Sequence, residues 1–210
     1  MPIYNGIEFI NDSVMSVISQ TNNKWELIIG INGHPPNSDC FNIAKTYEWM
    51  NSNIKVFDLH NCTGKGISLN EMLKYCTFDW ISILDVDDIW LPTKLDSQIP
   101  FTDKYDVIGT QCKYFGQLSS SPNIPLGDIS NYDFRTVNPI INSSCLVKKE
   151  LCSWSNSLVE DYELWLRLRK QGCSFYNVHD VQVLHRIHNN SAFNSKGNDN
   201  VAKQVVAKYV

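Results

Sequence analysis

Apolar and polar residues alternate along the first half of the chain in blocks that predict strands and helices in turn. Residues 7–20 carry apolar side chains at positions 7, 10, 14, 17 and 18, the spacing of one helical face. Short apolar runs predict buried strands at 25–31, 55–59 and 80–86. Helical patterns return at 38–52 and 68–75. This alternation is typical of βαβ units, so we expect an α/β fold with a mostly parallel central sheet flanked by helices.

The second half of the chain is less regular. Residues 106–115 predict a strand, 116–140 are rich in Ser, Pro, Asn and Gly and predict a long loop, and 145–151 predict a strand that runs into a short helix. The segment EDYELWLRLRKQG (160–172) predicts a helix, because acids crowd its first turn, bases crowd its last, and Gly172 follows. SFYNVHDVQVLHRIH, which follows it, predicts a strand or hairpin. We expect residues 1–210 to form a single domain, with 193–210 as a mobile or helical tail.

Composition narrows the class of protein. The net charge of −4 argues against a nucleic-acid binder, which would normally present a basic face. The seven cysteines are odd in number and contain no CxxC, so a disulfide framework or zinc site is not expected and a reducing compartment is. No apolar stretch approaches the length of a membrane span, which predicts a soluble, cytoplasmic protein.

The stretch ILDVDDIWLP places three carboxylates directly after a predicted buried strand. One Asp would be enough to shape a turn or cap a helix starting near Pro92, but three repel one another unless a cation joins them. In an extended segment Asp85 and Asp87 lie on the same side, about 6–7 Å apart. Hard cations such as Mg²⁺ and Mn²⁺ prefer carboxylate oxygens, often together with the phosphates of a substrate. These residues therefore predict metal and phosphate binding.

Other candidate positions have structural alternatives. Glu160 and Asp161 are favoured at a helix N-terminus in any case, but either could serve as a base. His185, Arg186 and His188 could hold an anion or complete a metal shell. Asn32-Gly33-His34 is a turn signal at a strand end, and Lys65 precedes a helix where it could meet a phosphate. Trp154, Trp165 and Leu168 are expected in the core or in a pocket wall.

Five of these stretches, taken in order, resemble glycosyltransferase family 2, which has the GT-A fold. MPIYNG resembles the family's P-x-Y-N strand end, and SVISQTNNKWELIIG its S-V-x-x-Q-T…W-E-L-I-I pattern. ILDVDDIWLPTKL resembles its D-x-D(D) segment, EDYELWLRLRKQG its E-D-x-x-L-W-L-R-L helix, and HRIHNNS its R-x-H-x-x-S ending. The resemblance spans roughly residues 1–192 and implies an inverting transferase. It would move a sugar from a nucleotide-diphosphate donor, usually a UDP-sugar, to a hydroxyl of a glycan, lipid or protein acceptor, with Mn²⁺ or Mg²⁺ as cofactor.

The resemblance also implies roles for particular residues on the donor side. Pro2 and Tyr4 would line the nucleoside pocket, and Asp85 would approach the ribose or the donor sugar. The family usually has an Asp pair after the second strand, where this chain has GINGHPP. Asn32 would then meet the base edge with a different set of donors and acceptors, which leaves the choice of base open.

For the metal and the chemistry, the resemblance implies that Asp87 coordinates the cation with Asp88 in support. Arg186 and His188 would face the diphosphate or the metal, although His185 remains an alternative ligand. Asp161 would be the catalytic base and Glu160 a supporting residue.

Two other functions remain open from sequence. One is a nucleotide-sugar-binding protein without transfer activity, suggested by Asn32 and by a first strand that looks very short. The other is a Mg²⁺-dependent phosphohydrolase, since DVDD also resembles a D-x-D nucleophile motif. That motif should follow the first strand, whereas DVDD follows a later one.

Overall fold

The apolar runs nearest the N-terminus form a wholly parallel three-stranded sheet. Its strands lie in the order β1 (Pro2–Ile3), β2 (Leu27–Asn32) and β3 (Ile54–Leu59). All six residues of β2 are buried, which explains why its sequence is a continuous apolar run rather than an alternating one. This structure is a computed structural model, and it describes residues 1–189, 191 and 198–209.

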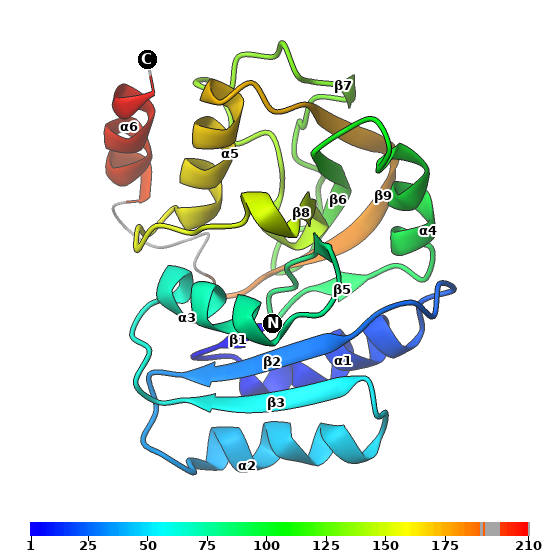
Figure 1. Cartoon of the computed structure of the whole chain (residues 1–210), viewed down its shortest axis with the longest axis vertical. Coiled ribbons are helices and arrows are strands. Elements are labelled where there is room, and N and C mark those ends of the chain that lie inside the picture. The colour runs from blue at the N-terminus through cyan, green and yellow to red at the C-terminus, as the bar shows by residue number, and fades with distance from the viewer. Residues whose placement is uncertain (190, 192–197, 210) are drawn as a thin grey trace.

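Helices cover both faces of this small sheet (Figure 1). They are η1 (Ile7–Phe9), α1 (Ile10–Ile18), α2 (Asp39–Lys45), η2 (Thr46–Trp49), α3 (Lys65–Met72) and η3 (Leu73–Tyr75). The predicted helical face of α1 buries Ile10, Val14 and Val17 in the same core as β2. Ser38 begins α2 by accepting a hydrogen bond from the Phe41 amide at 3.3 Å, the usual role of a serine N-cap.

The rest of the chain builds a mixed six-stranded sheet. Its main path is β4 (Trp80–Ile81), β8 (Leu146–Lys148), β6 (Val107–Gly116), β9 (Phe175–Ile187) and β5 (Ile89–Trp90), with β7 (Gly127–Asp128) beside β9. The long strands β6 and β9 run parallel, and the other pairs are antiparallel. The second sheet is accompanied by α4 (Lys94–Gln98), η4 (Ile99–Phe101), η5 (Asn142–Ser144), η6 (Lys149–Leu151) and α5 (Glu160–Lys170).

The mixed α/β fold with a parallel sheet and flanking helices is confirmed. One predicted strand is shorter than expected, because within 80–86 only Trp80 and Ile81 pair in a ladder, with β8. Ile83 and Leu84 are nevertheless buried at 3% and 1% exposure. They line an apolar cavity of about 380 Å³ together with Ile28 of β2. Hydrophobic burial made the run look like a strand, but strand assignment also needs a paired neighbour.

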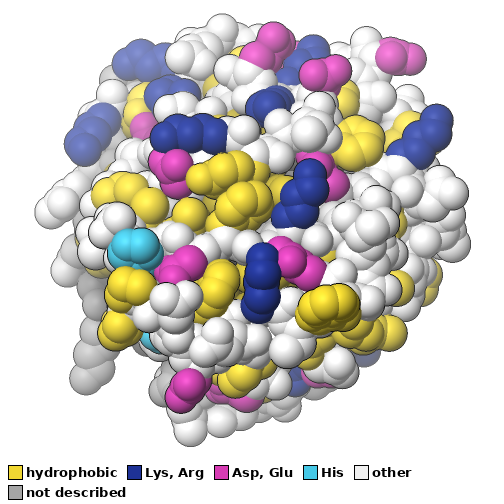
Figure 2. Space-filling view, turned by 60° about the horizontal axis from the view of Figure 1, so that its bottom comes forward, with side chains coloured by type: hydrophobic (Ala, Val, Ile, Leu, Met, Phe, Trp, Pro, Cys, Tyr) yellow, Lys and Arg dark blue, Asp and Glu magenta, His cyan; other side chains and the backbone are white. Residues whose placement is uncertain are grey.

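The C-terminal helix α6 (Asn198–Lys208) packs against α5, and its Val205 is buried at 4% exposure. The stretch 193–210 was predicted to be a mobile or helical tail: residues 198–208 of it form α6, and residues 193–197 and 210 lie outside the described residues. Among residues 1–189, 191 and 198–209, no helix is long and apolar enough to cross a membrane. On the face shown in Figure 2, acidic, basic and apolar side chains are interspersed.

Candidate active site

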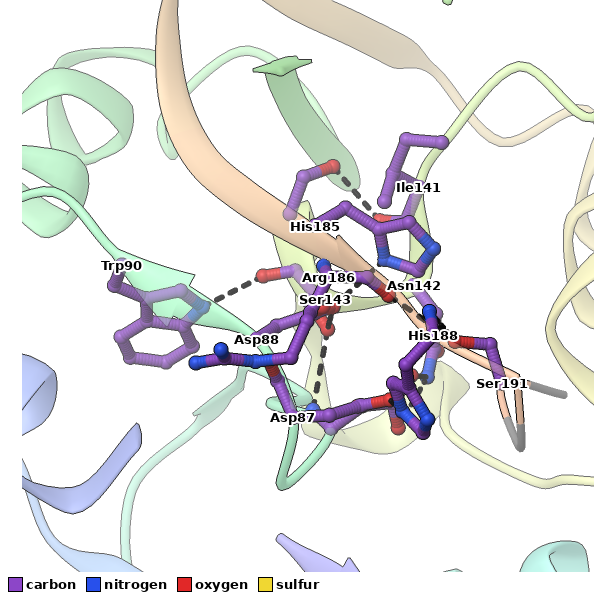
Figure 3. A network of polar contacts seen from close by, with 12 residues as sticks. Asp87, Asp88, Trp90, Ile141, Asn142, Ser143, His185, Arg186, His188 and Ser191 are labelled. Atoms are coloured by element: carbon purple, nitrogen blue, oxygen red, sulfur yellow. Dashed lines mark hydrogen bonds and ion pairs between the residues drawn. The ribbon is translucent and has the colours of Figure 1, made fainter. Parts of the chain in front are cut away.

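The DVDD segment forms a turn that is held by Ser143 of η5. The Asp85 amide donates to Ser143 Oγ at 3.1 Å, and Ser143 Oγ donates to Asp88 Oδ2 at 2.5 Å. The Trp90 indole donates to the Ser143 carbonyl at 2.7 Å (Figure 3). One serine therefore holds both ends of the turn. No periodic pattern indicates this role, because Ser143 lies in an irregular segment.

Asp88 is fully buried, with 0% exposure. Besides Ser143, its carboxylate contacts His185 Nδ1 at 3.0 Å and accepts from the Arg186 amide at 2.9 Å. These contacts join the turn to the end of β9. Burial alone would lower the pKa of His185, but the Asp88 carboxylate reverses that effect and raises it.

The Asp87 side chain contacts His188. Their Oδ2 and Nε2 atoms are 3.0 Å apart, and both side chains are about one-fifth exposed, at 20% and 21%. The His188 ring packs against Phe9, with centroids 5.0 Å apart. Burial raises the pKa of Asp87, and the neighbouring charges of Asp88 and Asp85 add to that increase. The turn thus concentrates negative charge at a partly open position.

Arg186 is held from several directions. Its Nε donates to the Asp87 carbonyl at 2.9 Å, and its terminal nitrogen donates to Asp12 of α1 at 2.8 Å. The guanidinium also lies over the rings of Phe9 and Phe115, 4.6 and 4.4 Å from their centroids. These contacts place Arg186 between α1, β6 and the DVDD turn.

Asp85 opens the turn, since its carbonyl accepts from the Asp88 amide, and its carboxylate has two partners. Lys65 Nζ, at the first residue of α3, is 2.8 Å from Asp85 Oδ1. Asn142 Nδ2 donates to both carboxylate oxygens at 3.2 and 3.1 Å. Burial alone would raise the pKa of Asp85, but the Lys65 ammonium outweighs it and the pKa is lowered. Asp85 is therefore held as a carboxylate.

Asp161 is the second residue of α5 and directly follows Glu160. Burial and the adjacent Glu160 raise its pKa to about 6, although Lys65 and a 3.0 Å hydrogen bond from Asn138 act in the opposite direction. Glu160 is only 6% exposed, and its Oε1 is 3.1 Å from Lys65 Nζ. A carboxyl group with a pKa near 6 can act as a general base close to neutral pH.

The strand ends at the other side of the site contain the residues expected to contact a nucleoside. Pro2 is buried in β1, whereas Tyr4 just beyond it is 57% exposed. Asn32, the last residue of β2, is 4% exposed. His34 Nε2 contacts the Tyr4 carbonyl at 2.5 Å, and their rings are 5.6 Å apart. The predicted turn at Asn32-Gly33-His34 is present, with Gly33 at φ +72°.

The structure brings the predicted carboxylates together with Lys65, Arg186 and the histidines. Three further residues hold this arrangement and were not predicted from the sequence: Ser143, Asn142 and Asn138. All three lie in or after the long segment that was predicted only as a loop. The first two hold the DVDD turn and Asp85, and the third binds the base candidate. Long loops often carry such residues without a local sequence signal.

A preformed metal cage is not evident, since no group of three or more His, Cys, Asp or Glu side chains in the described part of the chain is placed to hold an ion. Asp87 and His188 still offer one oxygen and one nitrogen donor side by side. Mg²⁺ is often bound by one or two carboxylates and completed by substrate phosphates, and Mn²⁺ accepts the same donor types. The pair therefore fits a metal that arrives with a diphosphate.

The sequence profile described as Glycosyl transferase family 2 matches residues 1–156 of this α/β chain. The chain belongs to glycosyl transferase family 2 and is a glycosyltransferase. Membership of this family argues against the phosphohydrolase function that the sequence had left open.

Two relatives from Escherichia coli illustrate the similarity. The O-antigen biosynthesis glycosyltransferase WbnJ is 27% identical over 91% of this chain and 79% of its own length. The UDP-Glc:alpha-D-GlcNAc-diphosphoundecaprenol beta-1,3-glucosyltransferase WfaP is 27% identical over 99% of this chain and 83% of its own.

Solved structures support the same fold. S. aureus TarS in complex with UDP-GlcNAc aligns with a TM-score of 0.78 at 15% identity, over 99% of this chain and 64% of that one. The mannosyltransferase PcManGT from Pyrobaculum calidifontis, with GDP-Man and Mn²⁺, aligns with a TM-score of 0.69 at 13% identity, over 91% of this chain and 56% of that one. This chain spans less than two thirds of either structure, and the likeness bears on the fold alone.

Proposed function

We propose that this chain transfers a sugar from a UDP-sugar to an acceptor hydroxyl with inversion, in the presence of Mn²⁺ or Mg²⁺. The observation that carries the proposal is the position of Asp161. It is a carboxyl group with a pKa of about 6 in the same site as Asp85 and Asp87, the acids expected on the donor side. UDP is favoured over GDP because the TarS structure is a complex with UDP-GlcNAc and WfaP is named for UDP-Glc, although the PcManGT structure is a complex with GDP-Man.

On the donor side, we assign Asp87 and His188 to the metal and Asp85 to a hydroxyl of the ribose or sugar. A bound divalent cation would stabilise the negative charge that develops on the departing nucleotide diphosphate. Asp88 holds the turn in place, because its buried carboxylate binds Ser143, His185 and the Arg186 amide. Arg186 fixes the Asp87 carbonyl by the contact at 2.9 Å.

On the acceptor side, we assign Asp161 as the base that takes the proton of the attacking hydroxyl. In-line attack from the face opposite the leaving group inverts the anomeric centre. Asn138 donates to Asp161 at 3.0 Å and belongs to the long 116–140 segment, so this segment lies beside the path of the acceptor. The acceptor would be a hydroxyl of a glycan, a lipid-linked sugar or a protein, and WfaP is an example named for a diphosphoundecaprenol acceptor.

A donor panel tests the proposal directly. Release of UDP from UDP-glucose, UDP-galactose and UDP-N-acetylglucosamine, and of GDP from GDP-mannose, is measured with Mn²⁺ and with EDTA. We expect turnover with one UDP-sugar that depends on the metal and falls on the order of 10²-fold or more in Asp161→Asn. Asp180→Asn serves as the matched control, because Asp180 is exposed on β9 away from the DVDD turn.

Two results would count against the proposal. Full turnover in Asp161→Asn would remove that residue as the base. Tight UDP binding without turnover on any donor or acceptor would instead favour a nucleotide-sugar-binding protein.

A further inference from the structure

Lys65 forms ion pairs with acids from two different parts of the site. Its Nζ is 2.8 Å from Asp85 Oδ1 and 3.1 Å from Glu160 Oε1. Asp85 follows β4, whereas Glu160 opens α5, the helix that also carries Asp161. The Lys65 side chain is 34% exposed, so it lies at the edge of the site rather than in the core. One ammonium group thus joins the donor side to the base side.

The docking of α3 explains how Lys65 reaches both acids. An added Cβ at Gly66 would lie 2.1 Å from the Ser155 carbonyl oxygen, so the helix start fits against this backbone only without a side chain. Further along α3, the Asn70 side chain donates to the Trp154 carbonyl at 2.7 Å and accepts from the Trp154 amide at 2.9 Å. Both contacts are with the loop that leads into α5. The N-terminal turn of α3 is therefore built onto the base-bearing segment.

The position of Lys65 affects the charge balance around Asp161. Glu160 is buried beside Asp161, and Lys65 forms ion pairs with Glu160 and Asp85. The Lys65 charge also acts on Asp161, whose pKa it lowers against the effect of Glu160. The thiol of Cys145 is also near, and burial raises its pKa to about 11, so it stays neutral there. Without Lys65, ionising Asp161 next to Glu160 would meet uncompensated like charge.

We propose that Lys65 is a positioning residue for sugar transfer, which holds Asp85 for the donor while offsetting the charge of Glu160 beside the base Asp161. This differs from direct binding of a donor phosphate, since two carboxylates already share the Lys65 ammonium. The inference rests on the proposed function only for its catalytic meaning, because the charge relation among Lys65, Glu160 and Asp161 can be measured without any donor.

The first experiment follows the Asp161 carboxyl by ¹³C NMR in the donor-free protein, with the signal assigned from the Asp161→Asn spectrum. Removing the ammonium in Lys65→Met should raise the titration midpoint of Asp161 by about one unit. Glu160→Gln should lower it by a similar amount, and Lys65→Arg should stay near wild type. Lys74→Met, at an exposed lysine paired with Glu71, is the matched control and should leave the midpoint unchanged.

The second experiment compares the pH dependence of turnover in the same variants. The acid limb of the pH–rate profile should move to higher pH in Lys65→Met and to lower pH in Glu160→Gln. In Lys65→Arg it should lie where it does in wild type. A merely structural role would lower the rates without moving the limb.

An unchanged Asp161 midpoint in Lys65→Met would overturn the inference. If Lys65→Met does not fold, Lys65→Gln, which also lacks the ammonium, replaces it with the same expected and contradicting results. Shifted midpoints in a protein that shows no transfer on any donor would refute the proposed function and leave the charge role of Lys65 standing.

Discussion

Asp161 and Asp87 are both acids whose pKa is raised, but their surroundings suit different tasks. Burial and Glu160 act on Asp161, which has one hydrogen bond from Asn138 and a pKa of about 6. Burial, Asp88 and Asp85 act on Asp87, which lies next to His188. A proton would relieve the charge at Asp161, and a cation would relieve it at Asp87. Environment therefore distinguishes the proposed base from the proposed metal ligand, although both are aspartates.

The raised pKa of Asp161 sets a pH dependence for turnover. The base must be ionised to accept a proton, so kcat/KM should rise with pH up to about 6 and level off above it. A pH–rate profile at low donor concentration measures this midpoint. A flat profile between pH 5 and 8 would contradict the assignment.

At the scale of elements, the site depends on segments that join the two sheets. The end of β9 is tied to the DVDD turn through Asp88, and α3 is tied to the loop before α5 through Asn70. Neither link could be predicted from periodicity, because hydrophobic spacing shows which face of an element is buried but not what it packs against. The strand ends themselves were predictable, since parallel strands deliver their carboxyl ends to one edge.

Gly66 tests the docking of α3. We expect Gly66→Ala to destabilise the protein by about 1–3 kcal/mol, because its Cβ would overlap the Ser155 carbonyl, and also to reduce turnover by displacing Lys65. Chemical denaturation and donor turnover measure the two effects.

Gly172→Ala provides the comparison for this prediction. Gly172 has φ +83° with nothing within 4 Å of an added Cβ, so this variant should lose stability through backbone strain alone. Normal turnover in both variants would show that the fit of α3 does not matter for the reaction.

At the scale of the whole molecule, a fully buried lysine lies at the start of α4, which packs against β6 and β9 of the second sheet. Lys94 has 0% exposure, and its Nζ donates to Gln98 Oε1 at 2.8 Å and lies 4.1 Å from the centre of the Trp90 ring. Burial lowers its pKa to about 7. The sequence placed Lys94 in a polar stretch after Pro92, so its burial follows from packing that no local pattern shows.

This lysine should make stability depend on pH. Between about pH 7 and the unfolded value of 10.5, the unfolded chain binds the proton of Lys94 and the folded protein does not. The free energy of unfolding should therefore gain a rising contribution with pH in this window. Urea denaturation at pH 7 and 9 should show a smaller rise in Lys94→Met than in wild type. Lys24→Met, at an exposed lysine, should keep the wild-type rise, and equal slopes in all three proteins would refute the buried-lysine account.

The α/β class and most elements of the molecule follow from its alternating sequence blocks, and the carboxylates of the site stand out in DVDD and ED. The rest depends on long-range contacts. Asn138, Asn142 and Ser143 come from a segment without periodicity, and residues 82–86 look like a strand although no neighbour pairs with them. Sequence patterns report burial and local shape, while partners across the fold are fixed only when the sheets assemble.

The most direct test of the account is calorimetric titration of UDP into the protein with Mn²⁺ and again with EDTA. We expect binding that requires Mn²⁺, is lost in Asp87→Asn and is retained in Asp161→Asn, because of these two residues only Asp87 is assigned to the metal. UDP binding of equal strength in EDTA, or an unchanged affinity in Asp87→Asn, would contradict the claim that the DVDD turn holds a cation for the nucleotide diphosphate.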